Sequence, residues 1–240
     1  MTSSTVKAPA RSAYWAGVRD GTPFILMAVP FATVFGVVAT DAGLTIAQAM
    51  GFSVLVIAGA AQFAAVQMMM ENAGIAFVLL AALAVNLRMA MYSASLVPYL
   101  GPAPLWKRAL VAYLNFDQTY ITSITRYEGR PEMSVAERVA YFFGVATPIT
   151  PLWIIMTLVG ILAGSAIPEA WALDFIVPIM FLAMVSPMLK SPAHVAAAAV
   201  SVVVALALSG LPSGTGLLIA AGAAMVTGAV METWIEGRQA

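Results

Sequence analysis

Residues 73–98 read AGIAFVLLAALAVNLRMAMYSASLVP, and this stretch decides the fold class. Its one charged residue is Arg88. A helix of about 20 predominantly apolar residues is enough to cross the hydrocarbon core of a bilayer. The polar and apolar residues do not alternate, as they would in the strands of a transmembrane barrel. The stretch therefore predicts a transmembrane helix.

Similar apolar runs recur along the whole chain. They are Phe24–Thr40, Ile46–Met70, Ala73–Pro98, Ala109–Ile124, Val139–Gly164, Trp171–Leu189, Ala193–Ser209 and Gly214–Met231. The chain is 62% hydrophobic and 9% charged, whereas soluble domains are about 45–50% apolar and about 25% charged. Because a single core could not bury this much apolar surface, the surplus must face lipid. We expect an all-α, polytopic transmembrane helix bundle with seven or eight membrane segments.

What the sequence lacks disfavours several classes of protein. The absence of cysteine removes disulfide scaffolds, thiol nucleophiles and thiolate metal sites. The formal net charge is +0 and no basic run lies outside the helices, so we expect no nucleic-acid partner. One histidine cannot supply a His-Glu-x-x-His zinc site, and no Gly-x-Ser-x-Gly hydrolase motif occurs. We expect neither an enzyme nor a bound cofactor.

The chain is organised as one membrane domain between two short ends. Residues 1–23 are polar and carry three basic residues, so we expect them to form an uncleaved cytoplasmic arm. Residues 24–235 form the transmembrane domain, and residues 236–240 form a C-terminal tail.

A weak internal sequence similarity suggests that the membrane domain has two related halves. Pro30 and Gly43 recur as Pro151 and Gly164, 121 residues later by subtraction of the residue numbers. Two interpretations stay open: chance, or a repeat with halves 24–124 and 139–231, of the kind from which many transporters are built.

The placement of basic residues creates a conflict over membrane orientation. Lysine and arginine in short loops favour the cytoplasmic side, and both the N-terminal arm and Lys107-Arg108 carry them. Three full crossings between them would place them on opposite sides. The conflict disappears if the segment Ile46–Met70 is broken and re-entrant. We expect it to open at Ile57-Ala58-Gly59-Ala60-Ala61-Gln62, where the backbone must then be buried or line a cavity.

An ionisable side chain inside a membrane span is costly and is therefore a candidate functional residue. Asn86-Leu87-Arg88 lies near the middle of the third segment. On a regular helix Asn86 and Arg88 point about 200° apart and cannot serve one pocket. Two interpretations of Arg88 stay open: a functional residue, or a side chain that reaches the basic end of the helix or forms an internal ion pair.

The fourth segment carries more polar residues than a lipid-facing helix would. They are Asn115, Asp117, Gln118, Thr119 and Thr122. Asp117 is the natural partner of Arg88. The pair either holds two helices together, or its carboxylate accepts a proton or a substrate ammonium. In the second segment, Gln62 lies among small residues, which more often indicate close helix packing than a substrate path.

These features favour a secondary transporter or the permease subunit of one. The paired aspartates of an intramembrane protease cannot be assembled, because Asp117 has no counterpart well inside another span. A channel would more naturally carry a repeated filter sequence, and no Walker motif for ATP hydrolysis is present. The alternatives are a permease or channel for another small solute, and a scaffold subunit without transport activity.

Six stretches occur in a characteristic order. They are Gly17-Val18-Arg19-Asp20-Gly21-Thr22-Pro23, Pro30-Phe31 with Gly36, Ala58-Gly59-Ala60-Ala61-Gln62-Phe63, Asn86-Leu87-Arg88, Tyr92-Ser93-Ala94-Ser95-Leu96-Val97-Pro98 and Asn115-Phe116-Asp117. In order and spacing the chain resembles the AzlC/YgaZ family of branched-chain amino acid permeases. In that family the residue after the Asn-x-Arg motif is often histidine, whereas this chain has Met89. This leaves Asp117 as the better candidate for a proton relay.

The resemblance implies a multi-pass protein of the cell inner membrane that exports valine, leucine or isoleucine with a small AzlD-type membrane partner. A homo-oligomer is left open. Such a substrate needs a cation or amide for its carboxylate, an acceptor for its ammonium and an apolar pocket. Arg88 or Asn86 could serve the first role and Asp117 the second, and opened backbone near Gly59 could donate amides. The candidate residues are Asp117, Arg88, Asn86, Gln62, Asn115 and Gln118.

Overall fold

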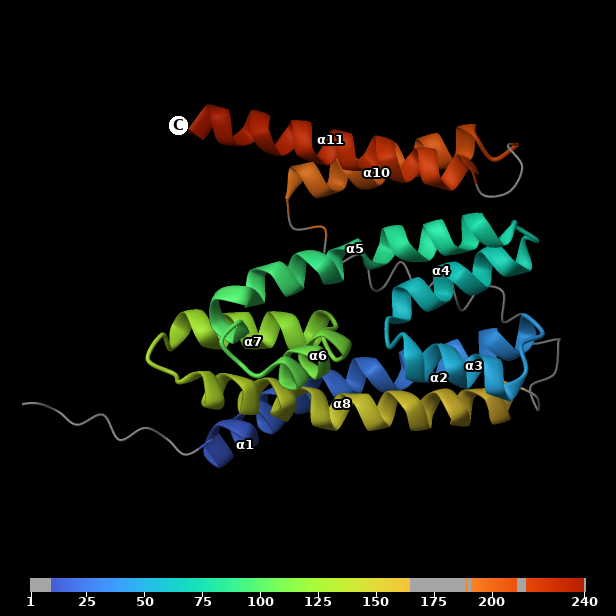
Figure 1. Ribbon diagram of the computed structural model, residues 1–240. Coiled ribbons are helices and arrows are strands. Elements are labelled where there is room, and N and C mark those ends of the chain that lie inside the picture. The colour runs from blue at the N-terminus through green and yellow to red at the C-terminus, as the bar shows by residue number, and fades with distance from the viewer. Residues whose placement is uncertain (1–9, 165–188, 190, 211–214, 240) are drawn as a thin grey trace, which may run out of the picture. The chain divides into compact units, whose positions relative to one another are not determined.

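The computed structural model describes residues 10–164, 189, 191–210 and 215–239, and every regular element among them is a helix (Figure 1). The elements are α1 (Ala10–Gly21), the 3₁₀ helix η1 (Thr22–Phe24), α2 (Ile25–Asp41), α3 (Ile46–Leu55), α4 (Gly59–Met70), α5 (Ile75–Leu100), α6 (Leu105–Tyr113), α7 (Asp117–Gly129), α8 (Val135–Gly164), α10 (Pro192–Ala207) and α11 (Thr215–Gln239). The expectation of an all-α fold is confirmed for these residues. The predicted segment Trp171–Leu189 lies, apart from Leu189, outside them.

The chain forms two compact units. The first comprises Met1–Phe63 and Leu83–Ile167, and the second comprises Ala64–Ala82 and Pro168–Ala240. Every candidate site residue lies in the first unit. In the second unit, α10 and α11 pack antiparallel, because Gly216 lies against Leu208 while Gly228 lies against Ala197.

The N-terminal arm predicted over residues 1–23 is helical where it is described. α1 continues through η1 into α2 without a loop, and Pro23 lies in the short 3₁₀ turn, where its missing N–H costs little. Residues Ala10–Asp41 together form a 32-residue stretch that is long and apolar enough to cross a membrane. The first helical stretch thus begins at Ala10 rather than at Phe24.

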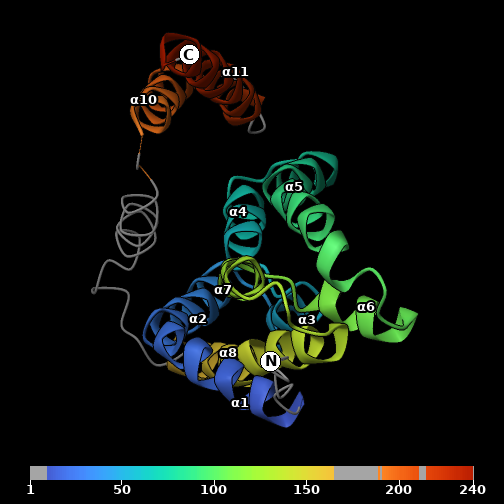
Figure 2. The same cartoon turned by 90° about the vertical axis from the view of Figure 1, so that its left-hand side faces the viewer.

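α8 packs against α1, α2, α3 and α7 in the first unit, and Figure 2 shows it lying along α1. Four glycines let the backbones of α1–α2 and α8 meet without a side chain between them. Each glycine lies against a backbone carbonyl oxygen of the opposite helix. That carbonyl belongs to the residue three positions before the glycine of the opposite helix. The contacts are Gly17 with Tyr141, Gly144 with Tyr14, Gly36 with Thr157, and Gly160 with Thr33. A Cβ at any of these glycines would overlap a backbone atom, so the helices run parallel in one fixed register.

These reciprocal contacts relate α1–α2 to α8 by a local two-fold symmetry. The paired glycines are 127 residues apart at Gly17 and Gly144, and 124 apart at Gly36 and Gly160, by subtraction of the residue numbers. The predicted internal similarity, which relates Pro30 to Pro151, has a different offset, of 121 residues. The offset changes across η1, which has no counterpart in α8. The symmetry concerns these helices, and the two larger repeat halves remain a prediction.

The second predicted segment is broken where its small residues were expected to open it. α3 ends at Leu55, α4 begins at Gly59, and Ile57 between them has φ 40°. A β-branched residue adopts this left-handed conformation only under strain, and burial of Ile57 to 6% exposure holds it in place. Gln62 Nε2 donates to Ser53 Oγ at 3.2 Å, although nine residues of straight helix would span about 13 Å. The first turn of α4 therefore folds back beside α3.

The predicted segment Ala109–Ile124 is not one helix, and that prediction was wrong. α6 ends at Tyr113, and α7 begins at Asp117. Between them Phe116 is extended, and its N–H donates to Thr119 Oγ1 at 3.0 Å. The Thr119 hydroxyl lies 2.7 Å from the Leu114 carbonyl oxygen, which accepts its proton. Thr119 satisfies the backbone groups that the break exposes, and a polar residue is needed there for this reason.

α6 and α7 form a hairpin whose outer ends meet. The ring of Tyr99, at the end of α5, lies 5.5 Å from that of Tyr127, near the end of α7, measured between centroids. The guanidinium of Arg138, near the start of α8, lies 5.3 Å from the first ring and 5.9 Å from the second. The hairpin therefore enters and leaves the unit at the same end.

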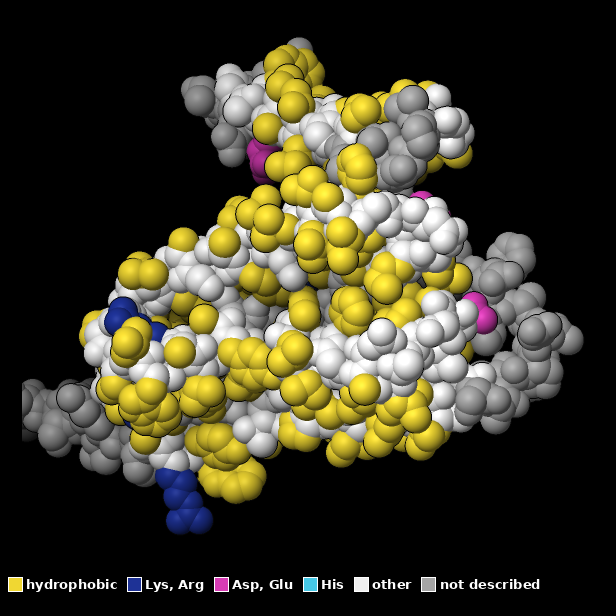
Figure 3. All heavy atoms as spheres, turned by 45° about the vertical axis from the view of Figure 1, so that its right-hand side comes forward, with side chains coloured by type: hydrophobic (Ala, Val, Ile, Leu, Met, Phe, Trp, Pro, Cys, Tyr) yellow, Lys and Arg dark blue, Asp and Glu magenta, His cyan; other side chains and the backbone are white. Residues whose placement is uncertain are grey.

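Three helical stretches among the described residues are long and apolar enough to cross a membrane: Ala10–Asp41, α5 and α8. Leu26 and Leu162 on the first and last of these remain 86% and 56% exposed. On the face shown in Figure 3, hydrophobic side chains cover much of the described surface, and charged side chains are few. Such a surface requires an apolar environment. The total of seven or eight membrane segments remains a prediction.

Candidate functional site

The candidate site is centred on an ion pair between α5 and α7. Arg88 Nη1 lies 3.0 Å from Asp117 Oδ2, so these two residues are partners, as predicted. Their side chains are 25% and 41% exposed. A fully buried pair that loses one partner leaves an uncompensated charge at high cost. This pair is only partly buried, so a ligand could reach both groups.

A second group from α5 completes the coordination of the carboxylate. Tyr92 lies one turn after Arg88 and on the same face of the helix. Its hydroxyl donates to Asp117 Oδ1 at 2.9 Å, and its ring stacks on that of Tyr120, with centroids 4.0 Å apart and planes 7° apart. Both carboxylate oxygens are therefore occupied. Tyr92 was not predicted as a site residue, although its four-residue spacing from Arg88 was the available signal.

The position of Asp117 in its helix favours a negative charge. It is the first residue of α7, where backbone N–H groups lack helical partners and the helix dipole is positive. Arg88 and Tyr92 add a cation and a hydrogen-bond donor. A ligand ammonium could replace the guanidinium at this carboxylate, and a proton on the carboxylate would release it. A ligand ammonium could therefore replace Arg88 as the cation paired with Asp117.

The three predicted amide residues near the pair have different surroundings. Asn115 Nδ2 donates to Ser93 Oγ at 3.2 Å, which joins the helix break to α5. The Oδ1 atoms of Asn115 and Asn86 are buried and accept no hydrogen bond from the described chain. Among the described residues, no hydrogen bond joins Asn86 or Gln118 to the ion pair. In the described part of the chain, Asn86 and Arg88 therefore share no hydrogen-bond partner.

Gln62 belongs to a separate polar network at the first helix break. Gln62, Ser53 and Thr157 are all 0% exposed. Gln62 donates to Ser53, whose hydroxyl lies 2.9 Å from that of Thr157. Thr157 in turn donates to the Trp153 carbonyl at 2.9 Å. This neutral network joins α3, α4 and α8, and no hydrogen bond in the described chain connects it to the Arg88–Asp117 pair.

The two helix breaks are neighbours. Tyr113, the last residue of α6, donates its hydroxyl hydrogen to the backbone carbonyl of Val54, near the end of α3. Ile57 from one break and Phe116 from the other belong to the same buried hydrophobic cluster. The ends of α3 and α6 and the starts of α4 and α7 therefore gather in one region of the first unit.

The described basic residues of the first unit, except Arg88, gather at one end of it. They are Arg11, Arg19, Lys107, Arg108, Arg126, Arg130 and Arg138. Parallel packing places the start of α1 beside the first half of α8, where Tyr14 donates to Thr147 Oγ1 at 2.9 Å. The contact between Tyr99 and Tyr127 brings the start of α6 to the same end. The described part of the arm and the Lys107-Arg108 pair therefore lie at the same end of the first unit, and the orientation of that end in the membrane remains a prediction.

Comparison with known proteins identifies related sequences. The family described as AzlC protein matches residues 23–167, which include both helix breaks and the ion pair. The chain is 25% identical over 213 residues to inner membrane protein YgaZ of Escherichia coli (strain K12), covering 85% of this chain and 86% of that one. It is 29% identical over 199 residues to an uncharacterized membrane protein of Archaeoglobus fulgidus, covering 80% and 82%. No solved structure matches the chain.

Proposed function

The chain belongs to the AzlC family of membrane proteins, and on this premise we propose that it is a transporter subunit that exports branched-chain amino acids. It works in the inner membrane, together with a small AzlD-type membrane protein. Valine, leucine and isoleucine share the chemistry that the site must recognise: a carboxylate, an ammonium and an apolar side chain.

The observation that carries the proposal is the accessible ion pair between Arg88 and Asp117. When a zwitterion enters, its ammonium takes the place of the guanidinium at Asp117, and the freed Arg88 receives its carboxylate. Each charge then exchanges an internal partner for a substrate group, so binding leaves no charge unpaired. Protonation of Asp117 would release the ammonium and couple transport to the proton gradient.

The paired helix breaks support transport over a purely structural role. Substrate sites of secondary transporters are typically formed by discontinuous helices, whose half-helix starts favour anionic groups. Here α4 and α7 both start at a break, and the two breaks are neighbours. Asn115, beside the ion pair, has a buried acceptor with no partner in the described chain, and it supplies one polar contact for the ammonium. Gln62 acts indirectly, by holding the first break.

The charge distribution supports one orientation in the membrane. Apart from Arg88, the described basic residues of the first unit lie at one end, and the positive-inside rule places such an end in the cytoplasm. The α6–α7 hairpin then dips into the membrane from the cytoplasmic side, with Asp117 near its tip. A substrate from the cytoplasm would approach along this hairpin.

The experiment that tests the function is efflux of preloaded radiolabelled valine from cells that lack other exporters. Efflux is measured for the chain alone and with its AzlD-type partner, each with and without a protonophore. We expect efflux that needs the partner and stops with the protonophore. The matched control is Glu128→Gln, an exposed change on α7, which should leave efflux unchanged. If no pairing gives efflux of valine, leucine or isoleucine, the substrate assignment is wrong.

A further inference from the structure

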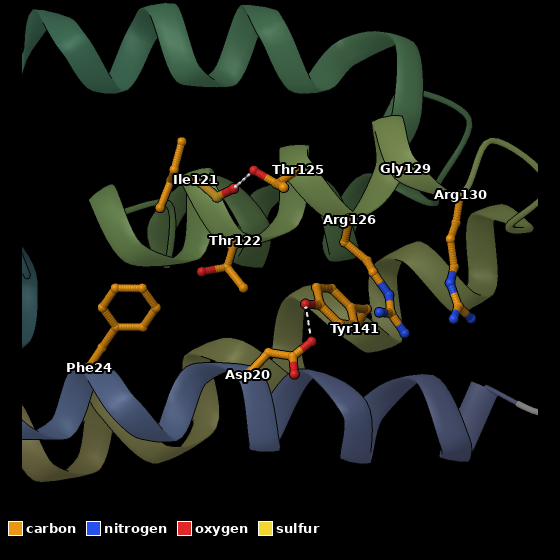
Figure 4. Close-up of a pocket in the computed structure, with 9 residues that line it drawn as sticks. All are labelled: Asp20, Phe24, Ile121, Thr122, Thr125, Arg126, Gly129, Arg130 and Tyr141. Carbon is orange, nitrogen blue, oxygen red and sulfur yellow. Dashed lines mark hydrogen bonds between the residues drawn. The ribbon is translucent and has the colours of Figure 1, made fainter.

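A cavity of about 490 Å³, widely open to the surface, lies between α1, α7 and α8, apart from the ion pair (Figure 4). Its lining residues are Asp20, Phe24, Ile121, Thr122, Thr125, Arg126, Gly129, Arg130 and Tyr141. Its volume falls in the range of about 300–1,000 Å³ typical of small-molecule sites. α7 links the two places: Asp117 and Arg126 are nine residues apart, which corresponds to about 13 Å along a helix.

One side of the cavity carries groups of both charges. The Tyr141 hydroxyl donates to Asp20 Oδ2 at 2.7 Å, which fixes that carboxylate beside the cavity. The other oxygen, Asp20 Oδ1, lies 3.4 Å from Nε of Arg19, whose side chain is 81% exposed, so a ligand ammonium would compete with a solvent-exposed guanidinium. The guanidinium of Arg126 lies 5.3 Å from the Tyr141 ring centroid, so the ring holds it by a cation–π contact. No carboxylate in the described chain pairs with Arg126, and its Nε is buried without a hydrogen-bond partner. Arg126 thus lines the cavity without an ion-pair partner in the described chain.

The other side of the cavity is apolar. In Figure 4, Phe24 and Ile121 lie at one end of the cavity, Arg126 and Arg130 lie at the opposite end, and Asp20 and Tyr141 lie between them. The Thr125 hydroxyl is turned to the Ile121 carbonyl, 2.8 Å away, and is not free for a ligand. The cavity therefore presents two arginines, a carboxylate and an apolar wall in one row.

We propose that this cavity is a second binding site, which takes an amino acid with an apolar side chain at the cytoplasmic end before it reaches the ion pair. The carboxylate pairs with Arg126, the ammonium with Asp20, and the side chain packs against Phe24 and Ile121. The inference rests on the proposed function, since it assumes the same class of substrate. α7 forms one wall of the cavity and also carries Asp117, so it provides a path from one site to the other.

The absence of cysteine from the chain allows a direct test of occupancy. Thr125→Cys introduces a single thiol in the cavity, and Glu128→Cys introduces one on the exposed side of the same helix. Labelling of each purified protein by a maleimide is timed with and without L-leucine. We expect leucine to slow labelling at position 125 at least threefold and to leave position 128 unchanged.

Analogues and second changes separate this site from the ion pair. Leucinamide lacks the carboxylate and 4-methylpentanoate lacks the ammonium, so both should protect position 125 much less than leucine. In the Thr125→Cys protein, the further change Arg126→Gln should raise the leucine concentration needed to protect position 125 from labelling at least tenfold. Adding Asp117→Asn, which disables the ion pair, should leave protection intact. Phe24→Ala provides an independent variant, which should weaken protection by leucine more than protection by alanine.

The outcomes distinguish the second site from the proposed function. If leucine is exported by cells but does not protect position 125, the second site is wrong and the function stands. If protection is lost with Asp117→Asn but kept with Arg126→Gln, leucine acts only at the ion pair and the second site is again wrong. Equal protection by 4-methylpentanoate or inorganic phosphate would make the cavity a general anion site, contrary to the proposal. If leucine is neither exported nor protective, both proposals fail.

Discussion

The two helix breaks are held by polar networks of opposite character. At the first break, Ser53, Gln62 and Thr157 are neutral and fully buried. At the second, Arg88 and Asp117 are charged and partly exposed. A buried network that loses one member leaves a polar group unsatisfied, whereas an exposed ion pair can exchange its partners with water or a ligand. One helix break is therefore held by a rigid neutral network, and the other by an ion pair that can change partners.

The largest expected effect comes from removing the charge that makes the second network exchangeable. Asp117→Asn should lower valine efflux about 10- to 100-fold, since hydrogen bonds to charged groups contribute about 1.5–3 kcal/mol. The amount of protein in the membrane should stay the same. The measurement is the initial rate of efflux, normalised to protein abundance.

A charge swap sharpens this prediction. If the pair only holds helices together, Arg88→Asp combined with Asp117→Arg should restore efflux, because the attraction is kept. If each residue receives a particular group of the substrate, the swapped protein should assemble and fail to transport. Restored efflux would remove Arg88 and Asp117 from the proposed mechanism.

A smaller effect is expected from changing the shape of the cation. Arg88→Lys keeps the charge but loses the planar fork that binds a carboxylate through two hydrogen bonds. We expect about a tenfold rise in the valine concentration that gives half-maximal transport, by the loss of one charge-assisted hydrogen bond. Concentration dependence in vesicles measures it, and a Lys variant as active as the parent would exclude bidentate recognition.

Changes in the neutral network should affect stability and not transport. Thr157→Val keeps the shape of the side chain but removes its bonds to Ser53 and to the Trp153 carbonyl. We expect unfolding to become easier by about 1–3 kcal/mol, with efflux per folded molecule unchanged. Thermal unfolding of the purified protein and efflux are measured side by side. A transport defect without a stability defect would show that the first break also takes part in exchange.

The smallest effect is expected at Tyr92. Tyr92→Phe removes the hydroxyl donor to Asp117 and keeps the ring that stacks on Tyr120. Arg88 and the start of α7 still stabilise the carboxylate when this donor is lost, so efflux should fall only about two- to tenfold, which corresponds to about 0.4–1.4 kcal/mol. Tyr120→Phe, which keeps the stack and removes a hydroxyl that makes no bond to Asp117, is the matched control and should have no effect.

Local composition was enough to predict the helical class and one of the two breaks. Apolar runs of span length predicted helices, and the small residues around Gly59 predicted where the second segment opens. The partnership of Arg88 and Asp117 followed from opposite charges that lipid would not tolerate alone. In each case the physical reason lies within a few residues of the feature.

Features that depend on distant partners could not be predicted in this way. The break before Asp117 needs Thr119 to bond the backbone at Leu114 and Phe116, and the composition there allowed a continuous helix. The hydrogen-bond network of Gln62 could not be predicted either, because Thr157, reached through Ser53, lies far along the chain. The helix of the N-terminal arm likewise depends on packing against α8, which its polar composition conceals.

The glycine contacts between α1–α2 and α8 have a mechanical consequence. Because each glycine faces a backbone carbonyl, sliding either helix by one residue would bring a side chain into that contact. α1–α2 and α8 therefore stay fixed relative to each other. Under the proposed function, a change that opens the unit to alternate sides of the membrane would then fall on other helices, among them α5 and α7, which bear the charged pair.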